Sequence, residues 1–157
     1  MNILFLCTGN SCRSIIAEAL LKSMAPAGVV VMSAGSKPAG YVHPRALAVL
    51  EKAGIPTAGF YSKSWDKLTE KPDVVITLCA DAADEACPHY FGKVVHSHWG
   101  MPDPAKVDGD ENKIAAAFDS TFAVLKRRMA ALTQLPFEKL RDDRQEFQTA
   151  LDTIAVQ

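Results

Sequence analysis

The sequence predicts an α/β fold, in which a four-stranded parallel sheet is flanked by helices. Short, almost wholly apolar runs alternate with segments whose apolar residues recur at helical spacing. Strands that are apolar at successive positions favour a parallel sheet covered on both faces. The chain has 157 residues, 48% of them hydrophobic, which suits one domain with a sizeable core.

Strand and helix signals alternate through the first half of the chain. We expect a buried strand at residues 3–6 and then a helix from about Ser14, which Pro26 ends. A second strand is expected at residues 29–32, closed by the loop SAGSKPAG. The segment HPRALAVLEKAG predicts a short helix, with a proline near its start and a glycine as its stop.

The second half continues this alternation and ends in helix. Residues 74–78 predict a third buried strand and residues 93–98 a weaker fourth one. A long amphipathic helix follows, with apolar positions at Ile114, Phe118, Phe122, Leu125, Met129 and Leu132. The tail from residue 136 is also amphipathic, and we expect a helix that buries Phe147 and Leu151 on the body or on a second subunit.

Composition and charge argue against several classes of protein. The formal net charge is −1 and the basic residues are scattered, so no nucleic-acid partner is expected. No apolar run approaches 18 residues, so no membrane span is expected. Met1 leads directly into an apolar segment without a targeting signal, which predicts a cytoplasmic protein. Its cysteines are then expected to be reduced: Cys7, Cys12, Cys79 and Cys87. The sequence does not indicate an oligomeric state.

The segment CTGNSCR, at the junction of the first strand and helix, predicts an oxyanion site. Five residues between Cys7 and Arg13 let the backbone curl with its N–H groups inward, and the helix adds its positive end. Gly9 and Asn10 tolerate the positive φ that such a curl can require. The expected anion-binding residues are Thr8, Gly9, Asn10, Ser11, Cys12, Arg13 and Ser14. Arg13 can bind two anion oxygens, and the same field favours the thiolate of Cys7, an attacking group beneath the anion.

Simpler interpretations of these thiols remain. The segment could be a tight turn with two buried cysteines. Cys12 is expected to be a packed thiol, with a redox partnership with Cys7 as the alternative. Cys79 follows the third strand, so both Cys7 and Cys79 should reach the same rim of the sheet, where ligands bind in such folds. For His43, near the same rim, a substrate role is the less favoured interpretation.

The motif CTGNSCRS after an N-terminal strand resembles the low-molecular-weight protein tyrosine phosphatase superfamily. The resemblance covers residues 1–134 and leaves residues 135–157 as a C-terminal helical extension of the same domain. It implies that Cys7 is the nucleophile, that Arg13 binds the anion and that Ser14 is a supporting hydroxyl. It also implies that Asp103, in the pair Asp103–Pro104, is the general acid, although an Asp-Pro pair can be plain turn chemistry.

The segment TLCADAADEACPHYFG decides between two branches of this superfamily. A tyrosine phosphatase has no use for two further cysteines there, whereas the sequence is similar to thioredoxin-linked arsenate reductases at CTGNSCRS, VHPRA, TLC…C and HWG…DP. That resemblance implies that Cys7 attacks arsenate, Asp103 protonates the leaving oxygen, Cys79 attacks Cys7, and Cys87 attacks Cys79. It implies no tightly bound cofactor, only an external dithiol reductant such as thioredoxin or glutaredoxin with glutathione.

Two departures from that branch concern Cys87 and a cation site. Seven residues separate Cys79 from Cys87, where the best-known reductases have six. Some relatives bind potassium beside the loop; Asn10, Glu18 and Ser33 match three of its ligands, but Lys63 stands where the fourth, an Asp, is expected.

Three alternative functions stay open at this point. A tyrosine or small-molecule phosphatase would use the same Cys7, Arg13 and Asp103. A non-catalytic oxyanion or redox sensor would only bind reversibly at Cys7. A zinc site could use Cys79, Cys87 and His89, although the spacing fits no common pattern.

The composition of residues 80–86 predicts a helix that Pro88 ends, because it includes four alanines and no Gly or Pro. Residues eight apart in a helix are separated by about 12 Å along the axis. A disulfide needs Cα atoms within roughly 7 Å. Forming a Cys79–Cys87 bond would therefore unwind this helix.

Overall fold

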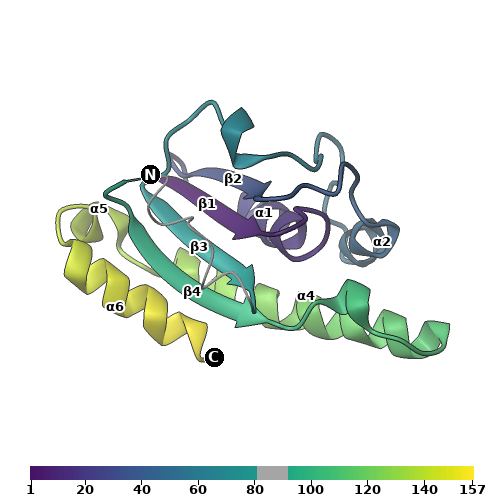
Figure 1. Cartoon of the computed structure of the whole chain (residues 1–157). Coiled ribbons are helices and arrows are strands. Elements are labelled where there is room, and N and C mark those ends of the chain that lie inside the picture. Colours follow the sequence, from purple (N-terminus) through teal and green to yellow (C-terminus); the bar gives the residue numbers. More distant parts are fainter. Residues whose placement is uncertain (81–91) are drawn as a thin grey trace.

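The computed structural model describes residues 1–80 and 92–157 of the chain. The strands are β1 (Asn2–Cys7), β2 (Val30–Gly35), β3 (Val74–Cys79) and β4 (Val95–Met101). The helices are α1 (Arg13–Met24), α2 (Pro44–Lys52), α4 (Glu111–Thr133), α5 (Phe137–Leu140) and α6 (Arg144–Ala155), with short 3₁₀ turns η1 (Trp65–Lys67) and η3 (Pro104–Lys106) (Figure 1). Of the helix predicted over residues 80–86, residues 81–86 lie outside the described residues, as do Cys87, Pro88 and His89.

The four strands form one parallel sheet in the order β2-β1-β3-β4, which confirms the predicted fold class. β1 lies between β2 and β3, with Phe5 beside Ile76. Cys7 ends β1 and Cys79 ends β3, so the two thiols lie at the same rim, as predicted from the sequence. The two thiols expected to react therefore lie at the carboxyl ends of neighbouring strands, where ligands bind in folds of this kind.

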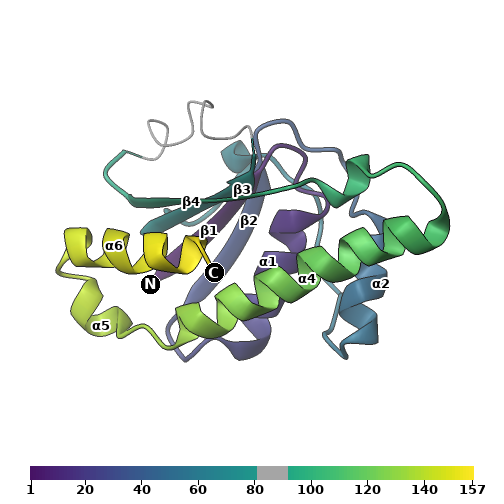
Figure 2. The same ribbon diagram turned by 90° about the horizontal axis from the view of Figure 1, so that it is seen from below.

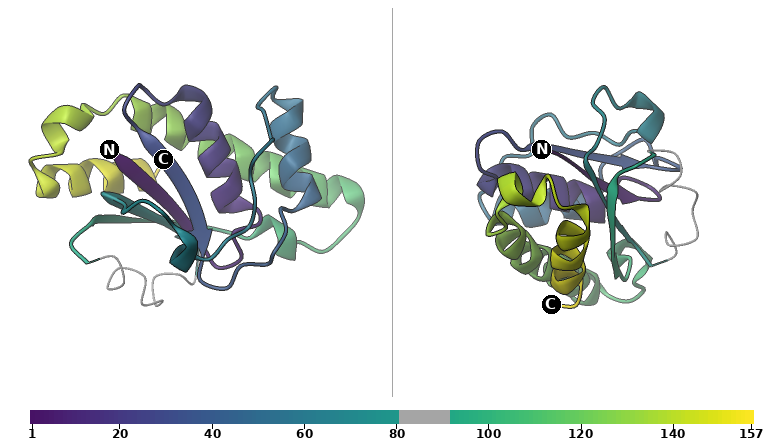
Figure 3. Two further views of the ribbon diagram at one scale, coloured as in Figure 1. Left: turned by 90° about the horizontal axis from the view of Figure 1, so that it is seen from above. Right: turned by 90° about the vertical axis from the view of Figure 1, so that its left-hand side faces the viewer.

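The strands bury side chains on both faces of the sheet. Ile3 and Phe5 face the larger apolar cluster, which α1, α4 and α6 cover, and these helices lie together on one side of the sheet (Figures 2 and 3). Leu4 and Leu6 point the other way into a smaller cluster, which Trp65 of η1 helps to cover. Alternate residues of one apolar strand thus serve two cores, which explains why the strand has no polar face.

β4 differs from its predicted bounds. The strand was expected at residues 93–98 but runs from Val95 to Met101, with burial that alternates along it. Trp99 is wholly buried, and its indole N–H donates to Ser97 Oγ and to the carbonyl of Leu151. The glycine at position 100 made the end of the strand look like loop, although it is here a strand residue.

The C-terminal tail folds back on the body of the protein. α5 and α6 bury Phe147, Leu151 and other apolar residues, and α6 packs on β4. Arg128 of α4 donates to the carbonyls of Trp99 and Ala155, which ties the end of α6 to the sheet. Helical structure and burial of the tail are confirmed; the division at residue 134 stays a prediction. Within residues 1–80 and 92–157, no helix has the length and hydropathy to cross a membrane.

Candidate active site

The loop between β1 and α1 forms the predicted curl. Asn10 has φ 44°, in the left-handed region that asparagine tolerates, whereas Gly9 lies outside that region. Of the two residues that tolerate a positive φ, the loop therefore uses one at Asn10 and not at Gly9. Gly35 of β2 allows the loop to approach closely, because a Cβ there would lie 2.5 Å from the carbonyl oxygen of Thr8.

The side chain of Asn10 stabilises the loop through three hydrogen bonds. Its amide donates to Ser14 Oγ (2.8 Å) and Ser33 Oγ (2.9 Å), and its carbonyl accepts from the N–H of Lys63 (2.9 Å). Asn10 is wholly buried, and its hydrogen bonds hold the loop in its curled conformation. The sequence placed it among the anion-binding residues, and its side chain in this structure is committed to protein partners.

The groups around Cys7 favour its thiolate form. Its Sγ lies 2.9 Å from Ser14 Oγ, and the residue is 5% exposed. The hydrogen bond from the Cys79 thiol, followed by those from the hydroxyl and N–H of Ser14 and by the charge of Arg13, lowers the pKa of Cys7 to about 6 against the opposing effect of burial. Cys7 is therefore ionised at neutral pH.

Cys79 contacts Cys7 and stays protonated beside it. The hydrogen bond to Cys7 and burial raise the pKa of Cys79, so one proton serves the pair, and it resides on Cys79. The N–H of Thr8 also donates to Cys79 Sγ (2.9 Å), which fixes this sulfur next to the loop. No local pattern predicts the contact between Thr8 and Cys79, because the two residues are 71 positions apart.

Arg13 and Asp103 form an ion pair across the site. Arg13 Nη2 lies 3.2 Å from Asp103 Oδ2, and Arg13 Nη1 donates to the carbonyl of Met101 (2.9 Å). The other carboxylate oxygen of Asp103 accepts from the N–H of Ala105, which caps η3. An anion that binds Arg13 must therefore share the guanidinium with Asp103.

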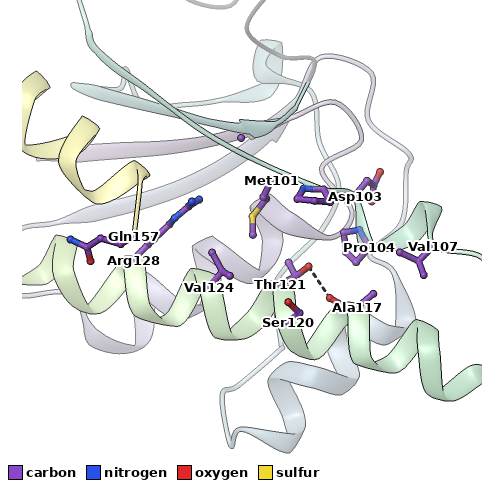
Figure 4. Close-up of a pocket in the computed structure, with 12 residues that line it drawn as sticks. Met101, Asp103, Pro104, Val107, Ala117, Ser120, Thr121, Val124, Arg128 and Gln157 are labelled. Carbon is purple, nitrogen blue, oxygen red and sulfur yellow. Dashed lines mark hydrogen bonds between the residues drawn. The ribbon is translucent and has the colours of Figure 1, made fainter.

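A cavity of about 180 Å³ opens over these groups. Its lining includes Cys7, Ser11, Cys12, Arg13, His43 and Asp103. A larger cavity of about 350 Å³ lies behind the Asp103 loop, bounded by α4 and the C-terminus (Figure 4). Its lining shares Asp103 and does not include Cys7, so the smaller cavity is the one at Cys7.

Cys12 lines the cavity as a neutral thiol. Burial, followed by the nearby charge of Asp103, raises its pKa to about 12. This favours the packed-thiol interpretation over a redox role, because the thiolate is the reactive form. Cys7, Arg13, Ser14, Asp103 and Cys79 are thus brought together.

The zinc alternative requires at least three ligating side chains at this rim of the sheet. Within residues 1–80 and 92–157, no three His, Cys, Asp or Glu side chains converge to hold a metal ion. Of the residues in the zinc alternative, Cys87 and His89 lie outside that part of the chain.

Lys63 lies beside the group that matches the potassium ligands. Its Nζ is 3.9 Å from Glu18 Oε2 and donates to the carbonyl of Tyr61. Ser33 Oγ donates to the same carboxylate. Asn10, Ser33 and Glu18 are thus engaged with each other and with an ammonium, so the residues do not fit a potassium ion.

Potassium is therefore expected to have no specific effect on this protein. Activity and melting temperature should be equal in potassium and sodium salts of matched ionic strength, because the ammonium groups of Lys22 (2.7 Å) and Lys63 (3.9 Å) already lie beside the Glu18 carboxylate. The control is Lys63→Asp, which returns a carboxylate to that position and should make the melting temperature depend on potassium. A potassium-specific rise in the unmodified protein would contradict this assignment of Lys63.

A family of known proteins and individual arsenate reductases are similar in sequence to this chain. Residues 2–146 match the family described as low molecular weight phosphotyrosine protein phosphatase. An arsenate reductase of Bacillus licheniformis is 43% identical over 117 residues, covering 74% of this chain and 83% of the relative.

Solved structures extend the similarity. An arsenate reductase in its phosphate-binding state matches with a TM-score of 0.70 at 28% identity, over 84% of this chain and 95% of that one. The thioredoxin-dependent arsenate reductase of Corynebacterium glutamicum matches with a TM-score of 0.55 at 33% identity, over 85% of this chain and 63% of that one.

Proposed function

This chain belongs to the low molecular weight phosphotyrosine protein phosphatase family, and from that premise we propose that it reduces arsenate to arsenite through a thiol relay. The observation that carries the proposal is the pair Cys7 and Cys79, in contact at the ends of neighbouring strands with one thiolate and one thiol. Ester hydrolysis needs only the first sulfur. The arsenate reductases among the relatives support the same choice.

The first step is nucleophilic attack on arsenic. Arsenate is a tetrahedral oxyanion, and Arg13 supplies the charge that binds it in the cavity above Cys7. The Cys7 thiolate forms a sulfur–arsenic bond while one arsenate oxygen leaves as water, with a proton from Asp103. Asp103 is within ion-pair distance of Arg13, so the proton donor and the anion-binding group share one edge of the cavity.

The second step is thiol attack on the adduct. Cys79 gives up its proton and attacks Cys7 Sγ, the sulfur–arsenic bond breaks, and its electron pair stays on arsenic, which takes up the proton and leaves as arsenite. A Cys7–Cys79 disulfide remains. Formation of the adduct removes the Cys7 anion that raises the pKa of Cys79, while the N–H of Thr8 still donates to Cys79 Sγ. The second thiol is therefore activated only after the first has reacted.

The last steps return the enzyme to its reduced form. We propose that Cys87 attacks Cys79 and that an external dithiol of the thioredoxin type, or glutaredoxin with glutathione, reduces the resulting bond. Cys87 lies outside the described residues, so its place in the relay rests on the sequence resemblance. We further propose that no cofactor is tightly bound and that the protein works in the cytoplasm in arsenic detoxification, because that compartment keeps thiols reduced.

Asp103→Asn should slow the first covalent step by roughly 10²–10⁴-fold, because the amide N–H is too weak an acid to protonate the leaving oxygen. Asparagine can still accept from the N–H of Ala105, so η3 should stay in place. Phosphate binding should be retained or become tighter, since Arg13 loses a competing carboxylate. Single-turnover arsenite formation and phosphate titration measure the two effects. Loss of binding with unchanged chemistry would reassign Asp103 to a structural role.

A coupled assay tests the proposed function as a whole. The full chain is mixed with arsenate, thioredoxin, thioredoxin reductase and NADPH, and arsenate-dependent NADPH oxidation is recorded with arsenite formation. Turnover with equal amounts of both is the expected result. The alternative is a tyrosine or small-molecule phosphatase with the same Cys7, Arg13 and Asp103. Rapid ester hydrolysis without arsenite formation, under the same conditions and with glutathione and glutaredoxin also supplied, would establish that alternative.

A further inference from the structure

His43 lies at the cavity but takes no part in the steps above. Its backbone N–H donates to the carbonyl of Ser11 (3.0 Å), and Ser11 Oγ donates to the carbonyl of Tyr41 (2.9 Å). These bonds join the segment before α2 to the loop around Cys7. His43 lines the same cavity as Cys7 and Asp103.

The hydrogen bonds of His43 fix which ring nitrogen carries the proton. Nδ1 accepts from the N–H of Arg45 (3.1 Å) and so caps the N-terminus of α2. A neutral ring that accepts at Nδ1 has its hydrogen on Nε2. Burial, followed by the charge of Arg45, lowers the pKa of His43 against the opposing effect of Asp103, so the ring is neutral at pH 7.

The orientation of the ring is also fixed. Its centroid lies 4.9 Å from that of Phe118 on α4, which is buried, at an interplanar angle of 32°. The hydrogen bond at Nδ1, the contact with the Phe118 ring and the backbone bond to Ser11 together restrict the orientation of the ring. A rigid N–H donor beside an anion site loses little entropy when it binds.

We propose that His43 is a substrate-positioning residue, whose neutral imidazole donates the Nε2 hydrogen to an oxygen of the bound tetrahedral oxyanion. This proposal rests on the proposed function for the identity of the substrate. Arg13 provides charge, but it is already engaged with Asp103 and the Met101 carbonyl. A second, uncharged donor would fix which oxygen faces Asp103 and is protonated as it leaves.

Two substitutions separate this role from capping. In His43→Asn, the side-chain oxygen can replace Nδ1 as the cap of α2, but nothing reaches the position of Nε2. In His43→Gln, the longer amide can place an N–H near that position, while the cap is lost. A purely structural His43 therefore predicts damage in the Gln variant, and a substrate donor predicts damage in the Asn variant.

Inorganic phosphate is the probe, titrated into the reduced full-length protein by calorimetry at pH 7 and pH 8. We expect His43→Asn to weaken binding by roughly tenfold or more, the effect of losing a hydrogen bond to a charged acceptor. Its melting temperature should stay near that of the unmodified protein. His43→Gln should recover at least half of the loss on a logarithmic scale, with a melting temperature lower by about 2–4 °C. The loss in the Asn variant should be equal at both pH values, because the donor is neutral.

Binding in His43→Asn within twofold of the unmodified protein overturns the proposal. So does equally weak binding in both variants, which would assign the ring a packing role, and so does an effect that disappears at pH 8, which would make His43 a cation. These outcomes concern phosphate binding alone. A protein that binds phosphate through His43 but forms no arsenite would disprove the proposed function and leave this inference standing.

Discussion

Cys79→Ser is expected to abolish arsenite formation while hydrolysis of a small phosphate ester such as p-nitrophenyl phosphate continues. Serine cannot attack the Cys7 sulfur and accept the oxidation, so the adduct has no route to arsenite. The Cys7, Arg13 and Asp103 set needed for ester hydrolysis is unchanged. Arsenite release and nitrophenol release, measured on the same preparation, give the two rates. Arsenite turnover that survives in Cys79→Ser would contradict the relay.

Cys79→Ala is the matched control, because it also removes the donor to Cys7. The bond from Cys79 is the largest cause that lowers the pKa of Cys7 to about 6. A serine hydroxyl can replace it and an alanine cannot. The pH at which Cys7 alkylation is half-maximal should therefore stay near 6 in the serine variant and move upward in the alanine variant. Equal midpoints in the two variants would mean that Cys79 does not stabilise the thiolate.

The parts of the fold that local sequence signals determine were predictable. β1 and β3 are apolar at successive positions and bounded by loop residues, and α4 keeps one apolar stripe over about five turns. The motif fixed the order strand, curl, helix, and therefore the places of Cys7 and Arg13. The end of β4 was missed because its alternate positions are partly exposed and one of them is glycine.

Long-range contacts of the site could not be predicted. The acceptor for Arg13 is the carbonyl of Met101, a backbone group that any residue would supply, 88 positions away. The donor from Thr8 to Cys79 is likewise a backbone N–H. Asn10 was identified by its tolerance of positive φ, which says nothing about where its amide points. Such contacts depend on the sheet order and on strand lengths, which no local pattern specifies.

Cys7→Ser should abolish both arsenite formation and ester hydrolysis, the largest loss of any single substitution in this chain. A serine hydroxyl in the same place is not ionised at neutral pH, and an oxygen–arsenic adduct offers Cys79 no sulfur to attack. Phosphate should still bind, since Arg13 is unchanged and the anion no longer meets a negative sulfur. The measurements are both turnover rates and a phosphate titration.

Cys12→Ser is the matched control for that loss, because Cys12 lies in the same loop and lines the same cavity. Its pKa is raised to about 12, so it is a neutral thiol at working pH and its replacement should leave most activity in place. The contrast isolates thiolate character from the mere presence of sulfur in the loop. More than a trace of either activity in Cys7→Ser would refute Cys7 as the nucleophile, and inactivation by both substitutions would mean that Cys12 shares the chemistry. Arg13 lowers the pKa of both cysteines, so the difference between them has two other sources. Hydrogen bonds from Cys79 and Ser14 lower the pKa of Cys7, whereas burial and the charge of Asp103 raise that of Cys12.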